Sequence, residues 1–275
     1  MFKIQLKDTE LDLTTPLVMG ILNATPDSFF KGSRMEAIDL GVQKAIEMVD
    51  AGAGILDIGG QSTRPGADII SEAIEIERVV PMIEAIHAAM PNRTISIDTY
   101  HAGVAKAALD AGASIVNDIS CGNFDPKMIA TVVHNQAGYI GMHQTGGPAT
   151  MHLVENRSNI METLVDYFMA KKSQFAEAGL TTWMIDPGFG FSKTVEENFK
   201  IVQSLSMLKV LDLPILLGVS RKSSIYRTLG VNADAALNGT TVLNSIGLMG
   251  GANILRVHDV KEAKEAILLI EKMNA

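Results

Sequence analysis

The sequence has almost none of the features that stabilise secreted proteins or cross membranes. Its 275 residues include one cysteine, Cys121, which excludes an intrachain disulfide. Its longest apolar runs, such as 213–219, are far shorter than the roughly 20 residues that span a bilayer. The opening MFKIQLKDTELDL is charged where a signal peptide would be apolar. We therefore expect a cytoplasmic protein with no membrane partner.

Basic residues are outnumbered in this chain. Lys and Arg number 23 against 31 Asp and Glu, so the formal net charge is −8. An acidic surface does not suit polyanions, and we expect no nucleic-acid partner, although a local basic pocket can still bind a small anion. The remaining composition, 47% hydrophobic and 20% charged, is that of a globular protein rather than a disordered one.

Short apolar runs recur along the chain, each followed by turn residues and then a helical pattern. Eight such runs occupy residues 17–22, 55–58, 94–97, 114–116, 139–142, 182–185, 214–219 and 253–257. Continuous apolar runs are typical of buried parallel strands. Eight strand–helix units without a break predict a (β/α)8 TIM barrel formed by a single domain, residues 1–275. The alternative is an open doubly wound sheet, but the chain lacks the G-x-G-x-x-G and G-x-x-x-x-G-K-[ST] motifs that would favour it.

Other segments have clear local patterns. Residues 2–6 and 10–13 predict a short N-terminal β-hairpin that covers the bottom of the barrel. A helix is expected over 71–90, with Ser71 as its N-cap, and the longest helix over 155–179.

Two loops that follow strands, 23–35 and 60–71, exceed the usual two to six residues. Both are rich in Gly, Pro, Ser and Thr, which favours binding loops or lids. The alternative is that they are tolerated surface insertions.

Nearly every predicted strand ends in a polar or ionisable residue. In chain order these are Asn23, Asp57, Asp98, Asn117 with Asp118, His143, Asp186, the run 220–222, and Arg256 with His258. Barrel active sites are built at this end of the strands. The alternative for each single residue is that it starts a loop or caps a helix, but the recurrence at all eight strands favours a site.

The charges at the strand ends are also sorted. Acids and amides follow strands two, three, four and six, whereas cations follow strands seven and eight, where barrels often bind phosphate. Arg256 can grip a phosphate through two parallel hydrogen bonds, and His258 can add another donor. We therefore expect an anionic end of the substrate near strand eight and a donor-rich end near the acids.

Some polar residues have alternative explanations. Asp57 can simply bond loop backbone, and Asp118 can be a structural cap. His143 is expected to be a packed structural histidine rather than a catalyst, and Cys121 a thiol without chemistry.

Eight motifs in order carry a family resemblance over essentially the whole chain. They are GILNATPDSF (20–29), DIGGQSTRPGA (57–67), ISIDT (95–99), IVNDIS (115–120), MH-x3-G-x-P (142–148), DPGFGFSK (186–193), GVSRKS (218–223) and RVHDV (256–260). The set resembles the dihydropteroate synthase family. That family joins 6-hydroxymethyl-7,8-dihydropterin pyrophosphate to p-aminobenzoate, giving 7,8-dihydropteroate and pyrophosphate in folate biosynthesis. The resemblance implies a transferase with a (β/α)8 barrel that uses Mg²⁺ and usually forms a homodimer. It also implies that the enzyme is a target of sulfonamides.

The resemblance also implies how the pterin is bound. A pterin edge presents a ring N–H beside an exocyclic amine, which a carboxylate matches with two charge-assisted hydrogen bonds. Asp186 resembles the family's pterin anchor, with Asn117 beside it. Asp98 resembles a catalytic pterin-pocket residue whose charge stabilises the pterin cation. Lys222 resembles the catalytic lysine that contacts the pterin and borders the aminobenzoate site.

Other positions match the family's pyrophosphate end. They are Asn23, Thr63, Arg256 and His258, of which the last two are expected to act in catalysis. Asn23 is the metal-ligand candidate, because Mg²⁺ prefers oxygen ligands and phosphate partners.

The aminobenzoate site is expected to form when the two long loops close. Its implied residues are Phe30, Thr63, Arg64, Pro65, Phe191 and Ser223. The bond that breaks joins oxygen to a resonance-stabilised carbon, which favours an SN1-like route. An arylamine is already a neutral nucleophile, so no strong general base is needed.

The chain departs from the family pattern beside the second-substrate site. Lys31 stands where an acid is usual, Gln61 where Glu is common, and Ser192 where Gly is usual, while Thr145 lies in an atypical segment. Two rival functions share the pterin site: a methyltransferase that passes a methyl group from a methylfolate to a corrinoid protein, and a non-catalytic pterin-binding paralogue.

Overall fold

A closed parallel barrel forms the centre of the molecule. The computed structural model describes residues 2–24, 34–61, 69–151, 153–154 and 157–274. Within them, the barrel strands are β3 Leu17–Asn23, β4 Ile55–Gly59, β5 Thr94–Asp98, β6 Ile115–Asp118, β7 Gly138–Met142, β8 Met184–Asp186, β9 Leu216–Leu217 and β10 Ile254–Val257. Their order is β8-β7-β6-β5-β4-β3-β10-β9, and a parallel bridge between Ile185 and Ile215 joins the two outer strands. The structure thus confirms the barrel rather than the open sheet.

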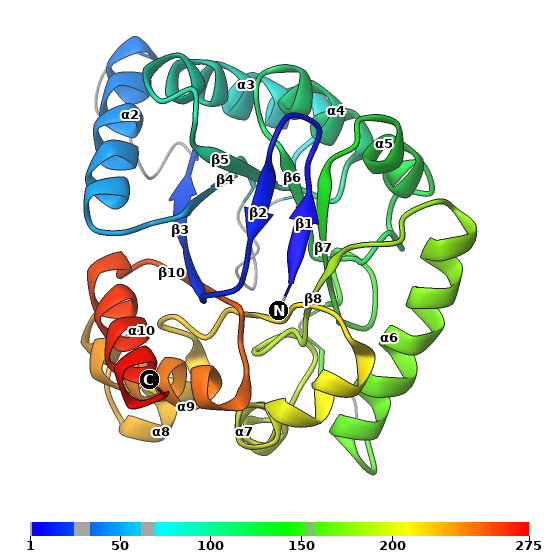
Figure 1. Cartoon of the computed structure of the whole chain (residues 1–275), viewed down its shortest axis with the longest axis vertical. Coiled ribbons are helices and arrows are strands. Elements are labelled where there is room, and N and C mark those ends of the chain that lie inside the picture. Colours follow the sequence, from blue (N-terminus) through cyan, green and yellow to red (C-terminus); the bar gives the residue numbers. More distant parts are fainter. Residues whose placement is uncertain (1, 25–33, 62–68, 152, 155–156, 275) are drawn as a thin grey trace.

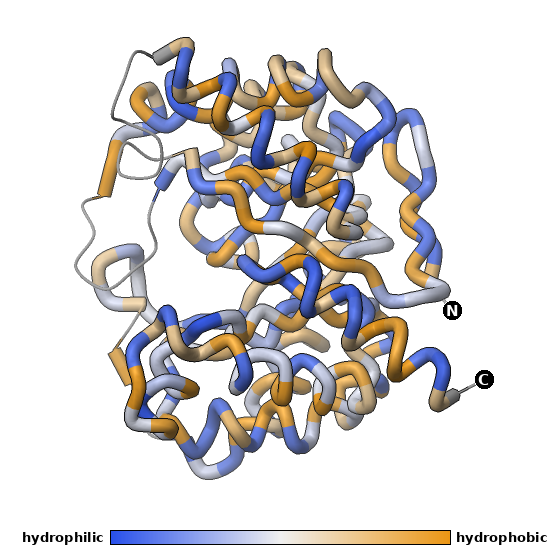
Figure 2. Tube along the Cα trace, turned by 90° about the vertical axis from the view of Figure 1, so that its left-hand side faces the viewer, coloured by the Kyte–Doolittle hydropathy of each residue, from blue (hydrophilic) through white to orange (hydrophobic). Residues whose placement is uncertain are grey.

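Helices surround the barrel (Figure 1). They are α2 Arg34–Asp50, α3 Glu72–Ala89, α4 Ala102–Asp110, α5 Met128–His134, α6 Ile160–Glu177, α7 Val195–Gln203, α8 Ser223–Leu229, α9 Leu237–Gly250 and α10 Val260–Asn274, with 3-10 turns η1 Leu205–Leu211 and η2 Asp234–Ala236. Figure 2 shows hydrophobic and hydrophilic residues mixed along these helices. That pattern suits helices with one face on the core, as in α3, where Val79, Ile83 and Ile86 are fully buried. Within the described ranges, no helix is long and apolar enough to span a bilayer.

The predicted helix boundaries hold for α3 but not for α6. The Ser71 hydroxyl accepts a hydrogen bond from the Ile74 N–H at 3.4 Å, so α3 begins where its N-cap predicts. The helix predicted over 155–179 does not begin at 155, and with 18 residues α6 equals α3 in length rather than exceeding it. The helix begins at Ile160 because the Asn159 side chain caps it, accepting a hydrogen bond from the Met161 N–H at 3.1 Å.

The N-terminal hairpin closes the bottom of the barrel. Its strands, β1 Lys3–Gln5 and β2 Glu10–Asp12, pair antiparallel, as expected from the sequence. Four buried residues of this segment pack against the first inward-facing layer of the barrel. The hairpin supplies Ile4, Leu6, Leu11 and Leu13, and the barrel supplies Met19, Ile55, Ile115, Ile140, Met184, Leu216 and Ile254. This end of the barrel is therefore apolar and filled.

The opposite end of the barrel is polar. Successive side chains of a strand point to opposite faces, so residues two positions beyond the bottom layer also face inward. Those residues include Asp57, Asn117, Asp186 and Arg256. In the pairing of β5 with β6, Asp98 lies directly opposite Asn117, so it also belongs to this polar layer. The barrel interior thus changes from apolar to ionisable along the strands, toward the end where barrels carry their sites.

Candidate active site

An arginine joined to two carboxylates occupies the centre of the polar end. Arg256 of β10 donates from Nε to Asp57 Oδ2 of β4 at 2.6 Å, and from Nη2 to Asp98 Oδ2 of β5 at 2.5 Å. Burial raises the pKa of Asp98 to about 7, while the charge of Arg256 opposes the rise. The pKa of Arg256 is itself raised, because the two carboxylates outweigh the effect of its burial. Arg256, the cation from the eighth barrel strand, therefore contacts the acids directly. The sequence had instead predicted that cations and acids occupy separate ends of the site.

Asp57 has a buried oxygen that is left without a partner. Its Oδ2 accepts from Arg256 and also from Asn117 Nδ2 at 3.1 Å, so its partners are side chains rather than loop backbone. Its Oδ1 is buried and has no hydrogen-bond partner within the described part of the chain. A buried acceptor is costly to leave unpaired, which makes this oxygen a candidate to receive a ligand N–H.

A third carboxylate, Asp186, lies at the end of β8, close to a lysine. Asp186 is 6% exposed, and its Oδ1 accepts from the Gly188 N–H at 2.7 Å. Burial raises the pKa of Asp186, and the charge of Lys222 opposes that rise. Burial also disfavours the charged form of Lys222, which lowers its pKa to about 8. The Lys222 ammonium donates to the Phe189 carbonyl and lies 4.7 Å from the centre of the Phe191 ring.

The remaining predicted residues fall into two groups. Asn23 ends β3, Ser223 begins α8, and His258 follows β10, where its Nδ1 lies 3.0 Å from Ser220 Oγ. These positions are at the same end of the barrel as Arg256. The predicted residues Phe30, Thr63, Arg64 and Pro65, and the departure Lys31, lie outside the described residues.

Arg221 is the one strand-seven cation that faces elsewhere. It pairs with both carboxylate oxygens of Asp259, at 2.8 and 2.9 Å, and donates to the carbonyls of Ala233 and Asp234. These contacts tie the loop after β9 to the start of α10, so we assign Arg221 a structural role.

An apolar cluster beside the carboxylates was not predicted from the sequence. It comprises Tyr100, Ile119, Met142 and Met151, with Phe124 and Phe191 packed against them. Met142 ends β7, and Tyr100 and Ile119 follow β5 and β6 by one or two residues. Their positions at strand ends were the available signal, but apolar side chains there look like ordinary core. An apolar surface next to buried acceptors suits a flat ring that carries N–H donors.

Asp118 is a structural residue. Its Oδ1 accepts from the Ser120 N–H and hydroxyl, both at 2.7 Å, and its Oδ2 accepts from the Gly122 N–H and the Tyr139 hydroxyl, both at 2.8 Å. Four hydrogen bonds saturate the carboxylate and hold the turn after β6. The capping interpretation is therefore confirmed.

His143 and Cys121 are both buried, and neither changes its protonation state near neutral pH. Burial, together with the charge of Lys193, lowers the pKa of His143 to about 2, which keeps the ring neutral. The ring packs edge-on against Tyr167, with centroids 4.8 Å apart. Burial raises the pKa of the Cys121 thiol to about 12, so it stays protonated.

Known proteins share both this sequence and this barrel. The family model described as pterin binding enzyme matches residues 19–258. Dihydropteroate synthase of Escherichia coli strain K12 is 38% identical over 271 residues, covering 98% of this chain and 95% of the relative. The chain belongs to the dihydropteroate synthase family. Members of this family are transferases of folate biosynthesis, so the chain is an enzyme of that class.

Solved structures of dihydropteroate synthases agree with the fold. The Yersinia pestis enzyme, in a structure described as a sulfonamide drug complex, matches with a TM-score of 0.92 and 36% identity over 99% of both chains. The Clostridium difficile enzyme, solved in the presence of pteroic acid, matches with a TM-score of 0.89 and 37% identity over 94% of this chain and 97% of that one. All three relatives are synthases, which favours this activity over the methyltransferase and the non-catalytic paralogue.

Proposed function

We propose that this chain condenses 6-hydroxymethyl-7,8-dihydropterin pyrophosphate with p-aminobenzoate, releasing 7,8-dihydropteroate and pyrophosphate. The observation that carries the proposal is the cluster of Asp57, Asp98 and Arg256 at the polar end of the barrel, with Asn117 bonded to it. Buried acceptors beside an apolar surface suit a pterin, and a cation beside them suits its pyrophosphate.

Pterin recognition relies on acceptors that already lie in place. Asp186 and Asn117 are the proposed partners of the ring N–H, the exocyclic amine and the ring acceptors. The unpaired Oδ1 of Asp57 adds one more acceptor in the same layer. Fixed carboxylates require no reorganisation when the ring binds, so they add affinity and orientation together.

The pyrophosphate end is proposed to comprise Arg256, His258, Asn23 and Thr63. A guanidinium has five N–H donors, and the contacts of Arg256 to the two carboxylates use one on Nε and one on Nη2. The other donors can therefore bind phosphate oxygens while the carboxylate contacts stay intact.

Magnesium is proposed to bind at Asn23. Within the described residues, no three His, Cys, Asp or Glu side chains are grouped as a metal site. Mg²⁺ often binds through one protein oxygen, waters and substrate phosphates rather than through a protein cage. Asn23 would supply that oxygen, and the ion would neutralise charge on the leaving pyrophosphate.

The proposed route is dissociative. The carbon–oxygen bond breaks, its electron pair leaves with the pyrophosphate, and the carboxylate of Asp98 stabilises the pterin cation. Arg256 and His258 hold the leaving group. The neutral amine of p-aminobenzoate then attacks the cation, and the new bond's nitrogen loses a proton to solvent.

The second substrate is proposed to bind between Lys222, Phe191 and Ser223. Phe191 and Lys222 are already stacked, and Ser223 follows Lys222 directly. Phe30, Thr63, Arg64 and Pro65 complete this site in the proposal when the two long loops close. A sulfonamide, which has the shape of p-aminobenzoate, is proposed to compete there.

The test supplies the pterin pyrophosphate, labelled p-aminobenzoate and Mg²⁺ to the purified protein and measures dihydropteroate and pyrophosphate. Both products should appear in equal amounts, and Asp186→Asn should greatly reduce them. Pterin binding without any product would instead indicate the non-catalytic paralogue. Methyl transfer from a methylfolate would indicate the rival enzyme.

Assembly and location complete the proposal. Val242, Ile246 and Met249 of α9 are 49%, 41% and 66% exposed and recur every three to four residues, which supports a homodimer through this helix face. Light scattering should give twice the chain mass, and Ile246→Glu should halve it. The buried thiol of Cys121 supports a cytoplasmic location, and a core cluster that extends from Val18 to Ile267 supports a single domain.

A further inference from the structure

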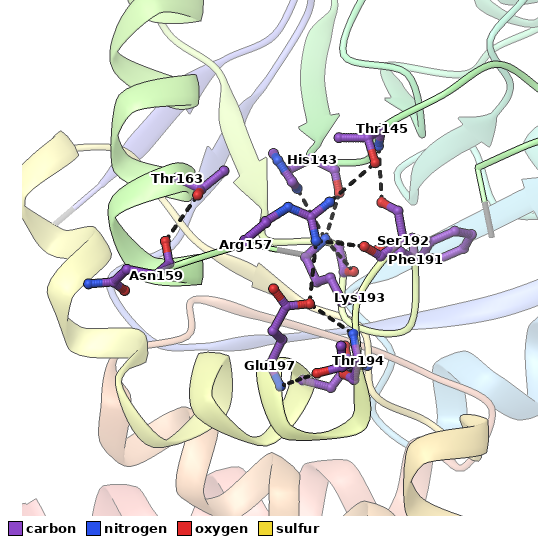
Figure 3. A network of polar contacts seen from close by, with 12 residues as sticks. His143, Thr145, Arg157, Asn159, Thr163, Phe191, Ser192, Lys193, Thr194 and Glu197 are labelled. Carbon is purple, nitrogen blue, oxygen red and sulfur yellow. Dashed lines mark hydrogen bonds and ion pairs between the residues drawn. The ribbon is translucent and has the colours of Figure 1, made fainter. Parts of the chain in front are cut away.

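The loop between β8 and α7, residues 187–193, is folded around a buried ammonium group. Lys193 is 5% exposed, and its Nζ donates to the carbonyls of Gly188 and Phe191, both at 3.0 Å. It also contacts the carbonyl and Nδ1 of His143 at the end of β7, both at 3.1 Å. Because His143 is neutral, its Nδ1 can accept from the ammonium. One cation therefore bridges the loop to β7 (Figure 3).

The loop backbone around Lys193 includes three residues in left-handed conformation. Gly188, Gly190 and Ser192 all have positive φ, of 71°, 86° and 47°. A side chain at Gly188 would collide with the His143 carbonyl. Ser192 is a non-glycine residue in left-handed backbone, which has a conformational cost that other contacts must offset.

Those contacts come from Arg157 and Thr145. The Ser192 Oγ accepts from the Thr145 N–H at 3.0 Å. The Arg157 guanidinium donates to the Ser192 carbonyl at 2.7 Å, to Thr145 Oγ1 at 3.2 Å, and to Glu197 Oε2 at 3.3 Å. The Arg157 and Glu197 side chains are 7% and 13% exposed, so these bonds are largely shielded from water. Arg157 therefore joins the loop after β7 to the loop after β8 (Figure 3).

The other side of the same loop faces the proposed second-substrate site. The Phe189 carbonyl accepts from Lys222, and the Phe191 ring lies beneath the same ammonium. The carbonyls of the loop thus alternate between two lysines, with Gly188 and Phe191 on Lys193 and Phe189 on Lys222. Any rotation of the loop that releases Lys193 would also move Phe191 relative to Lys222.

We propose that Lys193, Arg157 and Ser192 are positioning residues that set the affinity for the arylamine substrate by holding Phe191 against Lys222. This inference rests on the proposed function. A loop that spends only part of its time in the competent shape weakens the apparent affinity by that fraction. Pterin affinity should change less than arylamine affinity, because Asp57, Asp98, Asn117 and Asp186 belong to strands, although Asp186 also accepts a hydrogen bond from the Gly188 N–H of the loop.

The test compares Ser192→Ala and Arg157→Met with two variants of α6. Ser192→Ala removes the acceptor of the Thr145 N–H, and Arg157→Met removes the donors between the loops. Ser173→Ala and Lys172→Met are matched controls, because their side chains donate to backbone carbonyls away from the site. We measure kcat and KM for p-aminobenzoate, and the pterin dissociation constant by calorimetry.

KM for p-aminobenzoate should rise about fivefold for Ser192→Ala and about tenfold or more for Arg157→Met, as expected for one and several lost hydrogen bonds. The pterin dissociation constant should stay within about twofold, and the controls should match wild type. An unchanged KM in both variants would overturn the proposal. So would an equal loss of pterin affinity, because the network would then support the fold as a whole.

Hydrogen exchange separates this inference from the proposed function. In Arg157→Met, amides of 188–193 should exchange faster than in wild type while those of β4 and β5 stay protected. If wild type makes no dihydropteroate, the proposed function fails, and exchange still reports whether the network holds the loop. Unchanged exchange at 188–193 would refute the network by itself.

Discussion

Replacing Arg256 with Met tests whether one cation holds the two central carboxylates. The change keeps most of the side-chain length and removes both hydrogen bonds, at 2.6 Å to Asp57 and 2.5 Å to Asp98. The Arg256 side chain is 21% exposed, that of Asp57 is 0% exposed and that of Asp98 is 19% exposed. Breaking a fully buried ion pair costs about 3–5 kcal/mol. Because Arg256 retains partial contact with water, we expect a loss of about 2–4 kcal/mol in unfolding free energy at pH 8.

The loss should depend on pH, and its sign follows from Asp98. Burial raises the folded-state pKa of Asp98 from an ordinary 3.8 to about 7, so the native state binds its proton more tightly than the unfolded state. This carboxyl's contribution to stability therefore declines as pH rises from about 4 to about 7. Arg256 opposes the raised pKa, so without it Asp98 stays protonated to higher pH and the decline continues above 7. The cost of Arg256→Met should thus be smaller at pH 5.5 than at pH 8.

Urea unfolding at both pH values measures this effect. The set comprises wild type, Arg256→Met, Asp98→Asn and the double variant. Asp98→Asn should reduce the cost of Arg256→Met at pH 8, because one carboxylate is no longer left uncompensated. Arg221→Met is the control, since its ion pair with Asp259 does not involve Asp98. A cost that is equal at both pH values, and unaffected by Asp98→Asn, would refute the reasoning.

Three further variants test other parts of the molecule. Asp186→Asn should weaken pterin binding by about 2–5 kcal/mol, because a charged acceptor is lost; calorimetry with unchanged affinity would contradict its role as anchor. Tyr139→Phe removes one of four donors from the buried Asp118 carboxylate and should lower the unfolding free energy by about 1–3 kcal/mol, measured in urea. Leu11→Ala should cost about 2–4 kcal/mol, because Leu11 packs into the filled bottom of the barrel; a cost near zero would show that the hairpin is dispensable.

The strands were predictable because parallel barrel strands are buried on both sides. Each then reads as a short, continuous apolar run, and all eight predicted runs overlap the strands found. The strand at 214–219 was predicted too long, since only Leu216–Leu217 pair as β9. The start of α6 was missed because Arg157 and Ser158 fit a helical pattern, while the Asn159 cap that sets the boundary is a weak signal within it.

The site was predictable as a set of residues but not as a set of contacts. Barrel topology sends every strand end to one face, so Asp57, Asp98, Asn117 and Asp186 could be grouped from the sequence. The bond between Asp57 and Arg256 joins residues 199 positions apart in the chain and depends on which inward layer each occupies. Pairing Ser192 with Thr145 depends on loop shape, which residue types alone do not determine.

The barrel is closed by very little backbone pairing between β8 and β9. Within the described residues, β8 has three residues and β9 has two. A parallel bridge between Ile185 and Ile215 joins the two sides, and it includes the bond from the Ile185 N–H to the Pro214 carbonyl at 2.9 Å. Asp186 lies on one side of this seam, whereas Lys222 and Arg256 come from the other. A pterin pyrophosphate that binds residues on both sides of this junction would link β8 to β9 and β10 through the ligand. Because the ligand would bind only the folded barrel, it would raise the free energy of unfolding.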